Sequence, residues 1–511
     1  MLAKVISSTI IGIEAIKVTV EVDVAGGLPG FSIVGLPDPA VRESINRVKA
    51  AIKNCKLDFP SRKITVNLAP ADIKKEGPCF DLPIALGILT ATGQISQEGL
   101  NGKVFCGELS LDGALRPIAG ILPRAMALTN SYYKQLLLPF ENAKEAALVN
   151  DIEVLALENL EQVVSYLNNE IEIMPTKANA RSIWQDTGGC EFDFADVKGQ
   201  FHVKRGLEVA AAGGHNVLLV GSPGAGKTML AKCMPGILPQ MTPQEALETS
   251  KIHSVAGLIS NGKVIVSNRP FRAPHHCISD VALIGGGTYP KPGEISLAHN
   301  GVLFLDELLE FKRNALEALR QPLEAGHITV SRVASSVSYP ARFVLISACN
   351  PCLCGFFLDD SKQCHCTPNQ IQRYLSKISG PLLDRIDIHL EVPRLKYDQM
   401  ASRNKAETSS EIRKRVNKAG KVQEKRLKKL GYCYNARMNA RLTEKLCLLS
   451  DEARDLLKMA ILELGLSARA YHKVLKLGRT IADLAGEGEI NVEHISEAIS
   501  YRCLDRNIWM H

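Results

Sequence analysis

The sequence contains no apolar run long enough to cross a bilayer, which takes about 20 consecutive apolar residues. It also has no strong excess of one charge, because its formal net charge is only +7 at pH 7. The first residues, MLAKVISSTIIGIEAIKV, reach Glu14 and Lys17 within their apolar stretch, so they resemble a strand more than a signal peptide. We therefore expect a cytoplasmic protein with no membrane partner.

The 14 cysteines do not form the dense framework of a secreted disulfide domain, because most stand singly. Four of them lie together between residues 352 and 366. The composition, with 23% charged and 46% hydrophobic residues, is that of a globular protein. A chain of 511 residues exceeds what one hydrophobic core normally supports, so we expect two to four domains.

The most informative motif begins after four apolar residues, 217–220, which predict a buried strand. The motif is G-x-x-x-x-G-K-[ST], and an apolar helical start follows it. Its residues are Gly221, Ser222, Pro223, Gly224, Ala225, Gly226, Lys227 and Thr228. Glycines let backbone N–H groups surround phosphate oxygens, Lys227 is suited to the β and γ phosphates, and Thr228 to Mg²⁺. The strand–loop–helix setting favours a site for ATP and Mg²⁺ over an ordinary glycine-rich turn.

Two later apolar runs end in polar residues that suit the same chemistry. Residues 302–305 precede Asp306 and Glu307, which would lie at the carboxyl end of a strand, where open α/β sheets bind ligands. We expect Asp306 to hold Mg²⁺ and Glu307 to orient and deprotonate the attacking water; a surface corner is the alternative. A second run, 343–349, leads to Asn350, which is suited to contact the γ-phosphate or, alternatively, to cap the chain before Pro351.

Two arginines are candidates for further contacts with the nucleotide. The segment SGPLLDRID, residues 379–387, contains Arg385 and looks like the arginine-finger segment of AAA+ rings. This resemblance implies that Arg385 enters the neighbouring subunit's site and stabilises transition-state charge. The alternative is a structural ion pair with Asp384 or Asp387. Arg469, in a helical stretch that reaches residue 484, resembles the lid arginine that senses nucleotide, although the same helix could present it to solvent.

Residues 1–170 predict a separate α/β or α+β domain. Apolar alternation at 17–24 and 64–68 indicates strands, and the spacing at 40–52, 82–89 and 125–128 indicates helices. Segments 76–89 and 107–120 resemble the proteolytic domain of Lon proteases, a ribosomal-protein-S5-like fold.

The Lon resemblance implies a nucleophilic serine in the first segment and an activating lysine after the second. In this sequence those positions fall on Cys79 and on or near Arg124. An arginine stays protonated and cannot act as a base, and a cysteine without a base is a weak nucleophile at neutral pH. We expect a Lon-like domain that has lost its dyad and serves assembly or substrate contact, with residual hydrolase activity as the alternative.

A short loop concentrates four thiols: Cys352, Cys354, Cys364 and Cys366. This density suits tetrahedral Zn²⁺, which would staple a loop that lacks its own core. The C-x-C pairs are tighter than the usual C-x₂₋₄-C spacing, and Cys349 or His365 could replace one ligand. Free thiols are the alternative. The adjacent His275 and His276 are weaker candidates for a metal, because neighbouring side chains seldom converge without a third ligand, so we favour packing or a subunit contact for them.

Together these segments resemble the magnesium-chelatase-like branch of AAA+ proteins, and more closely the ComM/YifB group, over nearly the whole chain. Residues 192–200 resemble the segment that packs on adenine, and 269–280 with 285–287 are the most telling segments outside the nucleotide motifs. Two hairpins are indicated, at 258–266 with a central Asn-Gly and at 328–339. In this group such hairpins point into the pore of a ring.

The resemblance implies a multidomain α/β protein. We expect an S5-like α+β domain at residues 1–170, a linker at 171–191, and an AAA+ motor with a parallel sheet at 192–395. The motor would include the Cys-rich loop 349–366, and a C-terminal helical lid would occupy residues 396–511.

Residues 411–430 are strongly basic, with nine Lys or Arg against two Glu. Such a run is often only a solvated helix face, but in a ring-forming ATPase it could bind phosphate backbones without sequence preference. We favour nucleic acid, mainly because of the family.

The sequence thus predicts a ring-forming ATPase, a hexamer by resemblance, that moves DNA through its pore. Resemblance to the ComM group implies a helicase that drives branch migration during integration of transforming DNA. The alternatives are a magnesium-chelatase-type motor that remodels a protein partner and, from another class, a Lon-like ATP-dependent protease.

Overall fold

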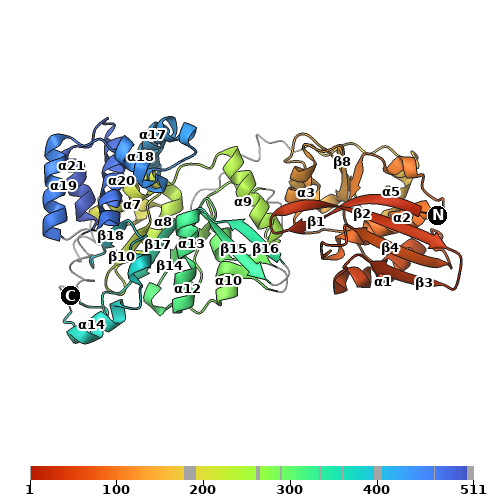
Figure 1. The fold of residues 1–511 in the computed structure, drawn as a ribbon, viewed down its shortest axis with the longest axis horizontal. Coiled ribbons are helices and arrows are strands. Elements are labelled where there is room, and N and C mark those ends of the chain that lie inside the picture. The colour runs from red at the N-terminus through yellow and green to blue at the C-terminus, as the bar shows by residue number, and fades with distance from the viewer. Residues whose placement is uncertain are drawn as a thin grey trace. The chain divides into compact units, whose positions relative to one another are not determined.

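The computed structural model describes residues 2–177, 191–259, 265–287, 290–332, 335–357, 359, 362–395, 406–464 and 467–502. The chain divides into two compact units, Met1–Asp186 with Ala246–Ser267, and Thr187–Glu245 with Asn268–His511 (Figure 1). Residues 246–267, which we expected within the motor, therefore group with the first unit. Most of the expected linker and the Asn-Gly turn of the expected hairpin 258–266 lie outside the described residues.

A four-stranded sheet in the order β1-β2-β4-β3 forms the centre of the first unit. Its β4 strand alternates buried and less buried residues, so one face of the sheet is covered. Helix α2 is buried along its whole length and packs on this sheet. A Cβ at Gly87 of α2 would come within 2.4 Å of Val22 Cγ2, so glycine permits the close approach of helix and strand.

The strands of this sheet are β1 (Leu2–Ile11), β2 (Glu14–Ala25), β3 (Gly30–Val34) and β4 (Lys63–Ala69), antiparallel except for β3 beside β4. A three-stranded parallel sheet contains β5 (Lys103–Phe105), β8 (Gln135–Pro139) and β9 (Glu153–Leu157), and β6 (Glu108–Leu109) pairs with β7 (Leu115–Arg116). The helices are α1 (Pro39–Asn54), α2 (Asp81–Ala91), α3 (Ile121–Leu128), α4 (Phe140–Ala146) and α5 (Leu160–Leu167). Most of α9 (Pro243–Val255) also groups with this unit.

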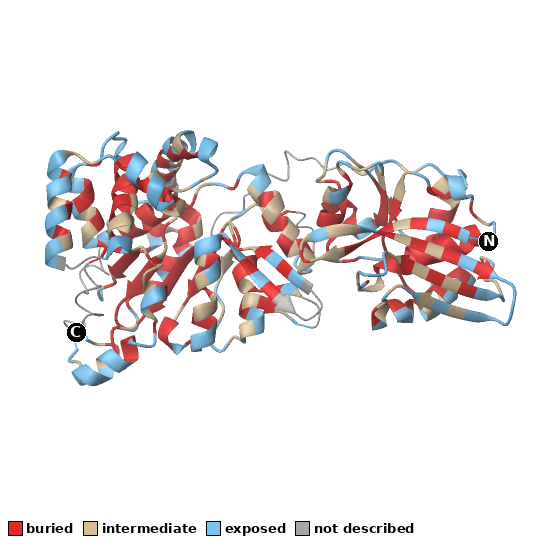
Figure 2. Ribbon diagram, in the orientation of Figure 1, coloured by how far each residue is buried: buried red, intermediate tan, exposed pale blue. Residues whose placement is uncertain are grey.

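The second unit is built on a five-stranded parallel sheet in the order β11-β14-β17-β10-β18. Every residue of β10, β14 and β17 is buried, as expected where both faces of a parallel sheet are covered (Figure 2). The three apolar runs that the sequence singled out are therefore adjacent central strands. Their carboxyl ends bring the motifs that follow them to one edge of the sheet.

The sheet strands are β10 (Val217–Val220), β11 (Phe271–Arg272), β14 (Val302–Leu305), β17 (Val344–Cys349) and β18 (Ile388–Glu391). Two small hairpins pair β12 (Gly285–Gly286) with β13 (Lys291–Pro292), and β15 (His327–Arg332) with β16 (Ser335–Pro340). The β15–β16 pair coincides with the hairpin expected at 328–339. The motor helices are α7 (Phe201–Gly213), α8 (Lys227–Ile237), α10 (Asp280–Ile284), α11 (Glu294–Leu297), α12 (Arg313–Ala318), α13 (Arg320–Ala325), α14 (Pro368–Leu375) and α15 (Gly380–Leu383).

The C-terminal part is helical, with α17 (Ser409–Leu427), α18 (Ala440–Leu446), α19 (Asp451–Leu464), α20 (Ala468–Ala485) and α21 (Val492–Ser500). Helix α17 begins with a capping box between Thr408 and Glu411. These helices share one hydrophobic core with α7 and the parallel sheet, and they therefore belong to the second unit together with the motor. Among the described residues, no helix is both long and apolar enough to cross a membrane.

Candidate nucleotide site

The phosphate-loop motif connects the end of β10 to the start of α8 (Figure 1). Gly224 and Gly226 have φ angles of +79° and +92°, a region that side chains other than glycine rarely adopt. Gly221 is required for a different reason, because a Cβ there would lie 2.3 Å from the carbonyl oxygen of Val392. The glycines thus let the loop curl tightly in front of the helix N-terminus, where backbone N–H groups favour an anion.

Lys227 lies buried under this loop. Its Nζ donates to the carbonyl oxygens of Gly221 at 2.7 Å and Ser222 at 3.1 Å, and to Asn350 Oδ1 at 3.1 Å. Burial lowers the pKa of Lys227, while the nearby Asp306 and Glu307 act in the opposite direction. The ammonium group is therefore held at the loop by neutral oxygens, which phosphate oxygens can replace.

Thr228 and Asp306 meet at the same edge of the sheet. The Thr228 hydroxyl donates to Asp306 Oδ2 at 2.7 Å, and Asp306 Oδ1 accepts from the Glu307 amide at 3.0 Å. Hydroxyl and carboxylate oxygens are the hard ligands that Mg²⁺ prefers, so these residues fit this ion.

Glu307 lies two residues after the end of β14 and has a φ of +51°, an uncommon conformation for a non-glycine residue. Its Oε2 lies 3.2 Å from His276 Nδ1. Strained backbone of this kind often occurs at active sites. Sequence reasoning missed this contact, because the two side chains are far apart along the chain and the sequence suggested only packing, a subunit contact or metal binding for His276. His275, His276 and Cys277 also bring their ligand atoms within 4.8 Å of one another.

A pocket of about 210 Å³ adjoins the phosphate loop. It is lined by Asp196, Val197, Lys198, Gln200, Ala225, Gly226, Met229, Leu230 and Leu395. Four of these residues belong to segment 192–200, which the sequence suggested for adenine, and four others come from the motif and α8. The pocket therefore lies where a base could extend from phosphates bound at the loop.

Arg385 follows α15 and forms an ion pair with Glu324, while its guanidinium also donates to the Pro381 carbonyl oxygen. Its partner is thus neither Asp384 nor Asp387, the two alternatives that the sequence suggested. Asp387 instead contacts Lys473 and His215. Burial would raise the pKa of Asp387, but the Lys473 charge and the His215 hydrogen bond outweigh it and hold this pKa well below its usual value.

Arg469, near the start of α20, is exposed and lies 3.6 Å from Asp384 Oδ2. Within the described part of the chain, neither Arg385 nor Arg469 has a hydrogen bond or ion pair to Lys227, Asp306 or Glu307. The structure therefore brings together Lys227, Thr228, Asp306, Glu307 and Asn350, and leaves the two arginines outside this group.

The basic run 411–430 separates into two sets of side chains on α17. Its arginines turn to protein partners: Arg413 donates to the Gly236 carbonyl oxygen, Arg415 pairs with Glu208, and Arg426 pairs with Asp483. Four lysines are exposed at a spacing of four, three and four residues, which places them on one helix face. This lysine stripe consists of Lys414, Lys418, Lys421 and Lys425.

In the first unit, Cys79 and Arg124 are buried together. The Arg124 guanidinium donates to Cys79 Sγ at 3.5 Å and to the Ser8 hydroxyl at 3.0 Å. Burial raises the pKa of Cys79 to about 11, although the Arg124 charge acts against this rise. The Cys79 thiol is therefore neutral at pH 7, which disfavours a nucleophilic role.

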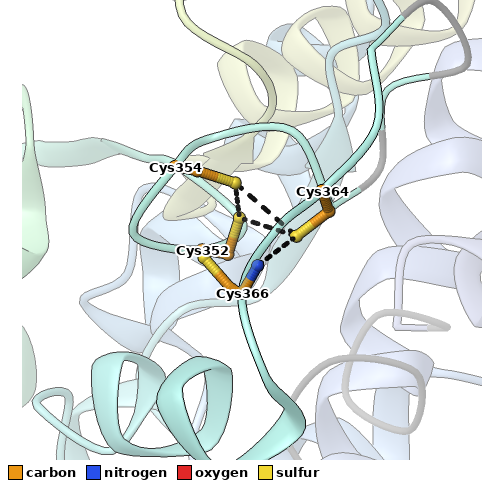
Figure 3. Close-up of side chains that lie close together, drawn as sticks. All are labelled: Cys352, Cys354, Cys364 and Cys366. Atoms are coloured by element: carbon orange, nitrogen blue, oxygen red, sulfur yellow. Dashed lines mark hydrogen bonds between the residues drawn. The ribbon is translucent and has the colours of Figure 1, made fainter.

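The four cysteines of the 352–366 segment also come together. Their sulfur atoms all lie within 4.8 Å of one another (Figure 3). Cys349, considered as a substitute ligand, is instead a buried residue at the end of β17.

Comparison with known proteins places these features in one family. The family described as "Magnesium chelatase, subunit ChlI" matches residues 193–400, "Subunit ChlI of Mg-chelatase" matches 20–142, and the ChlI C-terminal family matches 406–502. Lon protease 2 of Bacillus subtilis is 28% identical over 123 residues, 24% of this chain and 22% of that protein.

Two relatives match almost from end to end. YifB of Salmonella typhimurium is 43% identical over 508 residues, which cover 99% of this chain and 98% of the relative. Competence protein ComM of Haemophilus influenzae is 45% identical over 509 residues, with the same coverage. The parallel sheet that carries the phosphate loop agrees with the three ChlI matches. Because these matches are joined by 43–45% identity over nearly the whole length of both relatives, the chain belongs to the ComM/YifB family of magnesium-chelatase-like AAA+ proteins.

Proposed function

We propose that this protein is a ring-forming ATPase, hexameric as the resemblance implies, that uses ATP hydrolysis to move DNA. The observation that carries the ATPase proposal is the convergence of Lys227, Asn350 and the Thr228–Asp306 pair at one sheet edge. Family membership implies a nucleotide and Mg²⁺ at such a site, and Mg²⁺ neutralises charge that develops on the phosphates.

Each residue has a distinct task in this proposal. Lys227 exchanges its loop carbonyls for the β and γ phosphates, and Asn350 contacts the γ-phosphate from the end of β17. Thr228 and Asp306 hold Mg²⁺. Glu307 orients the attacking water and accepts its proton, while His276 fixes the direction of the Glu307 carboxylate.

Arg385 completes the site from the neighbouring subunit, after it exchanges Glu324 for the nucleotide's charge. Arg469, on α20, senses the same nucleotide from the helical part. The first role explains why Arg385 stands outside the residue group of its own protomer.

The lysine stripe supports the DNA part of the proposal. Four exposed ammonium groups on one face of α17 match the repeated charge of a phosphate backbone, whereas the arginines of the same helix are engaged within the protein. The β15–β16 hairpin is a second candidate contact, in the ring's pore. The Haemophilus relative, which matches over nearly its full length, is named a competence protein. We therefore place this activity in branch migration during integration of transforming DNA, in the cytoplasm.

The rival function is a magnesium-chelatase-type motor that acts on a protein partner, which the ChlI matches favour. The two functions differ in their response to DNA. The experiment measures the ATPase rate of the full chain without DNA, with single-stranded DNA and with a four-way branched DNA, beside Lys227→Ala as the inactive control. Stimulation by branched DNA supports the proposal.

An ATPase rate that no DNA changes would refute the DNA motor and leave the chelatase-type motor. Absence of ATPase activity in the wild-type chain would refute both. Casein cleavage that is lost in Cys79→Ala would instead support the Lon-like protease.

A further inference from the structure

The loop from Cys352 to Cys366 lacks the secondary structure and the apolar core that usually stabilise the conformation of a loop. Its described residues form no helix or strand, and two of its apolar side chains, Leu353 and Phe357, are 60% and 43% exposed. Cys352 is nevertheless fully buried. Apolar burial alone therefore does not account for the ordered fold of this loop.

All four sulfur atoms lie within 4.8 Å of one another, and three of them have separations close to those of a tetrahedral metal site. Cys352 Sγ lies 3.3 Å from Cys354 Sγ and 3.7 Å from Cys364 Sγ, and the latter two are 3.5 Å apart (Figure 3). Sulfur ligands about 2.3 Å from Zn²⁺ stand about 3.8 Å from one another in a tetrahedron. A disulfide needs only about 2.05 Å, so the arrangement matches a shared metal better than a pair of bridges.

Backbone amides point at the same sulfur atoms. The Cys366 amide donates to Cys364 Sγ at 3.4 Å, and the amides of Phe356 and His365 hydrogen-bond to Cys354. Such outer hydrogen bonds orient metal ligands and stabilise the charge on their sulfur atoms.

The loop also packs directly on the phosphate loop. The Gly355 amide donates to the Cys352 carbonyl oxygen and closes a turn. In this turn Gly355 has a φ of +84°. A Cβ on Gly355 would lie 2.6 Å from Pro223 Cδ, in the middle of the nucleotide motif.

A second connection runs through the chain itself. Asn350, which accepts from Lys227 Nζ, lies two residues before Cys352. A bond that holds Cys352 in place therefore also restrains Asn350, which contacts Lys227, and Gly355, which packs against Pro223.

We propose that this four-thiol cluster binds one Zn²⁺ ion and that the ion holds the loop against the phosphate loop, so that nucleotide affinity depends on it. The second half rests on the nucleotide site proposed above. Zinc accepts four thiolates after their protons leave, and it stabilises a loop that has no core of its own.

The metal is tested on the purified full chain by zinc analysis and by replacement with Co²⁺, whose absorption reports a tetrahedral thiolate site. We expect one zinc per chain, and loss of the metal and of the Co²⁺ bands in Cys364→Ser. Cys433→Ser, which removes an exposed cysteine outside the cluster, should keep both. A wild-type chain that contains no zinc and gives no Co²⁺ bands would overturn the proposal.

The coupling is tested by binding of a fluorescent ATP analogue before and after removal of zinc with a chelator, which avoids dependence on the folding of a variant. We expect removal to weaken nucleotide binding about fivefold or more, and added Zn²⁺ to restore it. Unchanged affinity would overturn the coupling. Lys227→Ala should weaken nucleotide binding and keep its zinc, so failure of the nucleotide site is distinguishable from failure of the metal site.

Discussion

His276 Nδ1 lies 3.2 Å from Glu307 Oε2, so an imidazole from the segment 269–280 contacts the carboxylate expected to activate water. The Glu307 side chain is otherwise 57% exposed, and its backbone has a positive φ. An exposed carboxylate samples many directions unless a partner holds it. We infer that His276 is a positioning residue, since it would act through Glu307.

Removal of this imidazole tests the contact. We expect His276→Ala to lower kcat for ATP hydrolysis about tenfold or more with little change in KM, because the carboxylate loses its direction but nucleotide binding does not involve it. His276→Asn, which keeps a donor, should recover part of the rate. Glu307→Gln should abolish turnover. A higher basal rate in His276→Ala would contradict positioning and indicate that the imidazole restrains the base.

Lys227 is expected to provide much of the affinity for nucleotide. Hydrogen bonds to charged groups contribute about 1.5–3 kcal/mol each, so Lys227→Ala should weaken ATP binding by about 10- to 100-fold. Titration with a fluorescent ATP analogue measures this. Lys458→Ala, at an exposed position of α19, is the matched control and should bind like the wild-type protein.

Arg385 should act on the neighbouring subunit. We expect Arg385→Ala to bind ATP normally and to lose turnover by a factor of about 10³ or more, as when an arginine finger is removed. Mixtures of Arg385→Ala with Glu307→Gln should regain activity, because some interfaces then combine an intact Glu307 with an intact Arg385. Glu324→Gln removes the present partner of Arg385 and should keep activity. Unchanged turnover in Arg385→Ala would exclude the role.

The lysine stripe should determine the salt dependence of DNA binding. Reversing two of its charges in Lys418→Glu/Lys421→Glu should weaken binding to DNA of any sequence. It should also reduce the slope of log K against log salt by about 0.9 for each phosphate that the protein no longer neutralises. Fluorescence anisotropy at several salt concentrations measures both. Lys445→Glu, an exposed reversal on α18, is the control. Equally weakened binding in the two proteins would count against a specific surface.

Cys79 should resist alkylation in the native protein. Its pKa of about 11 lies above the ordinary value, so the neutral thiol persists as the pH rises through 8, where only about one molecule in a thousand is ionised. The same shift means that the thiol's contribution to stability is complete below its unfolded pKa and is lost as the pH rises toward 11. Iodoacetamide labelling at pH 8, read by mass spectrometry, should modify the exposed Cys433 and spare Cys79 until the chain is unfolded. Comparable rates at the two cysteines would disprove this environment.

Much of this protein could be predicted from local sequence. The phosphate loop, the strands before Asp306 and Asn350 and the hairpin at 328–339 follow from short-range rules of periodicity and turn chemistry, and the structure contains them. The same holds in the first unit for the strands expected at 17–24 and 64–68 and the helices expected at 40–52, 82–89 and 125–128, whereas its other elements were not predicted. The family was also recognisable, because its motifs occur in order over nearly the whole chain. The boundaries of the compact units were harder to predict from the sequence. Residues 246–267 group with the first unit, and the C-terminal helices share the hydrophobic core of the motor.

Only the tertiary structure decided which distant groups meet. The order β14-β17-β10 brings Lys227 to Asn350 and Thr228 to Asp306, across 123 and 78 residues. It also places His276 on Glu307, Glu324 on Arg385 and Gly355 on Pro223. Backbone and side-chain preferences determine local conformation, whereas these contacts depend on how strands line up in a sheet. That alignment is a property of the whole core, which no single segment encodes.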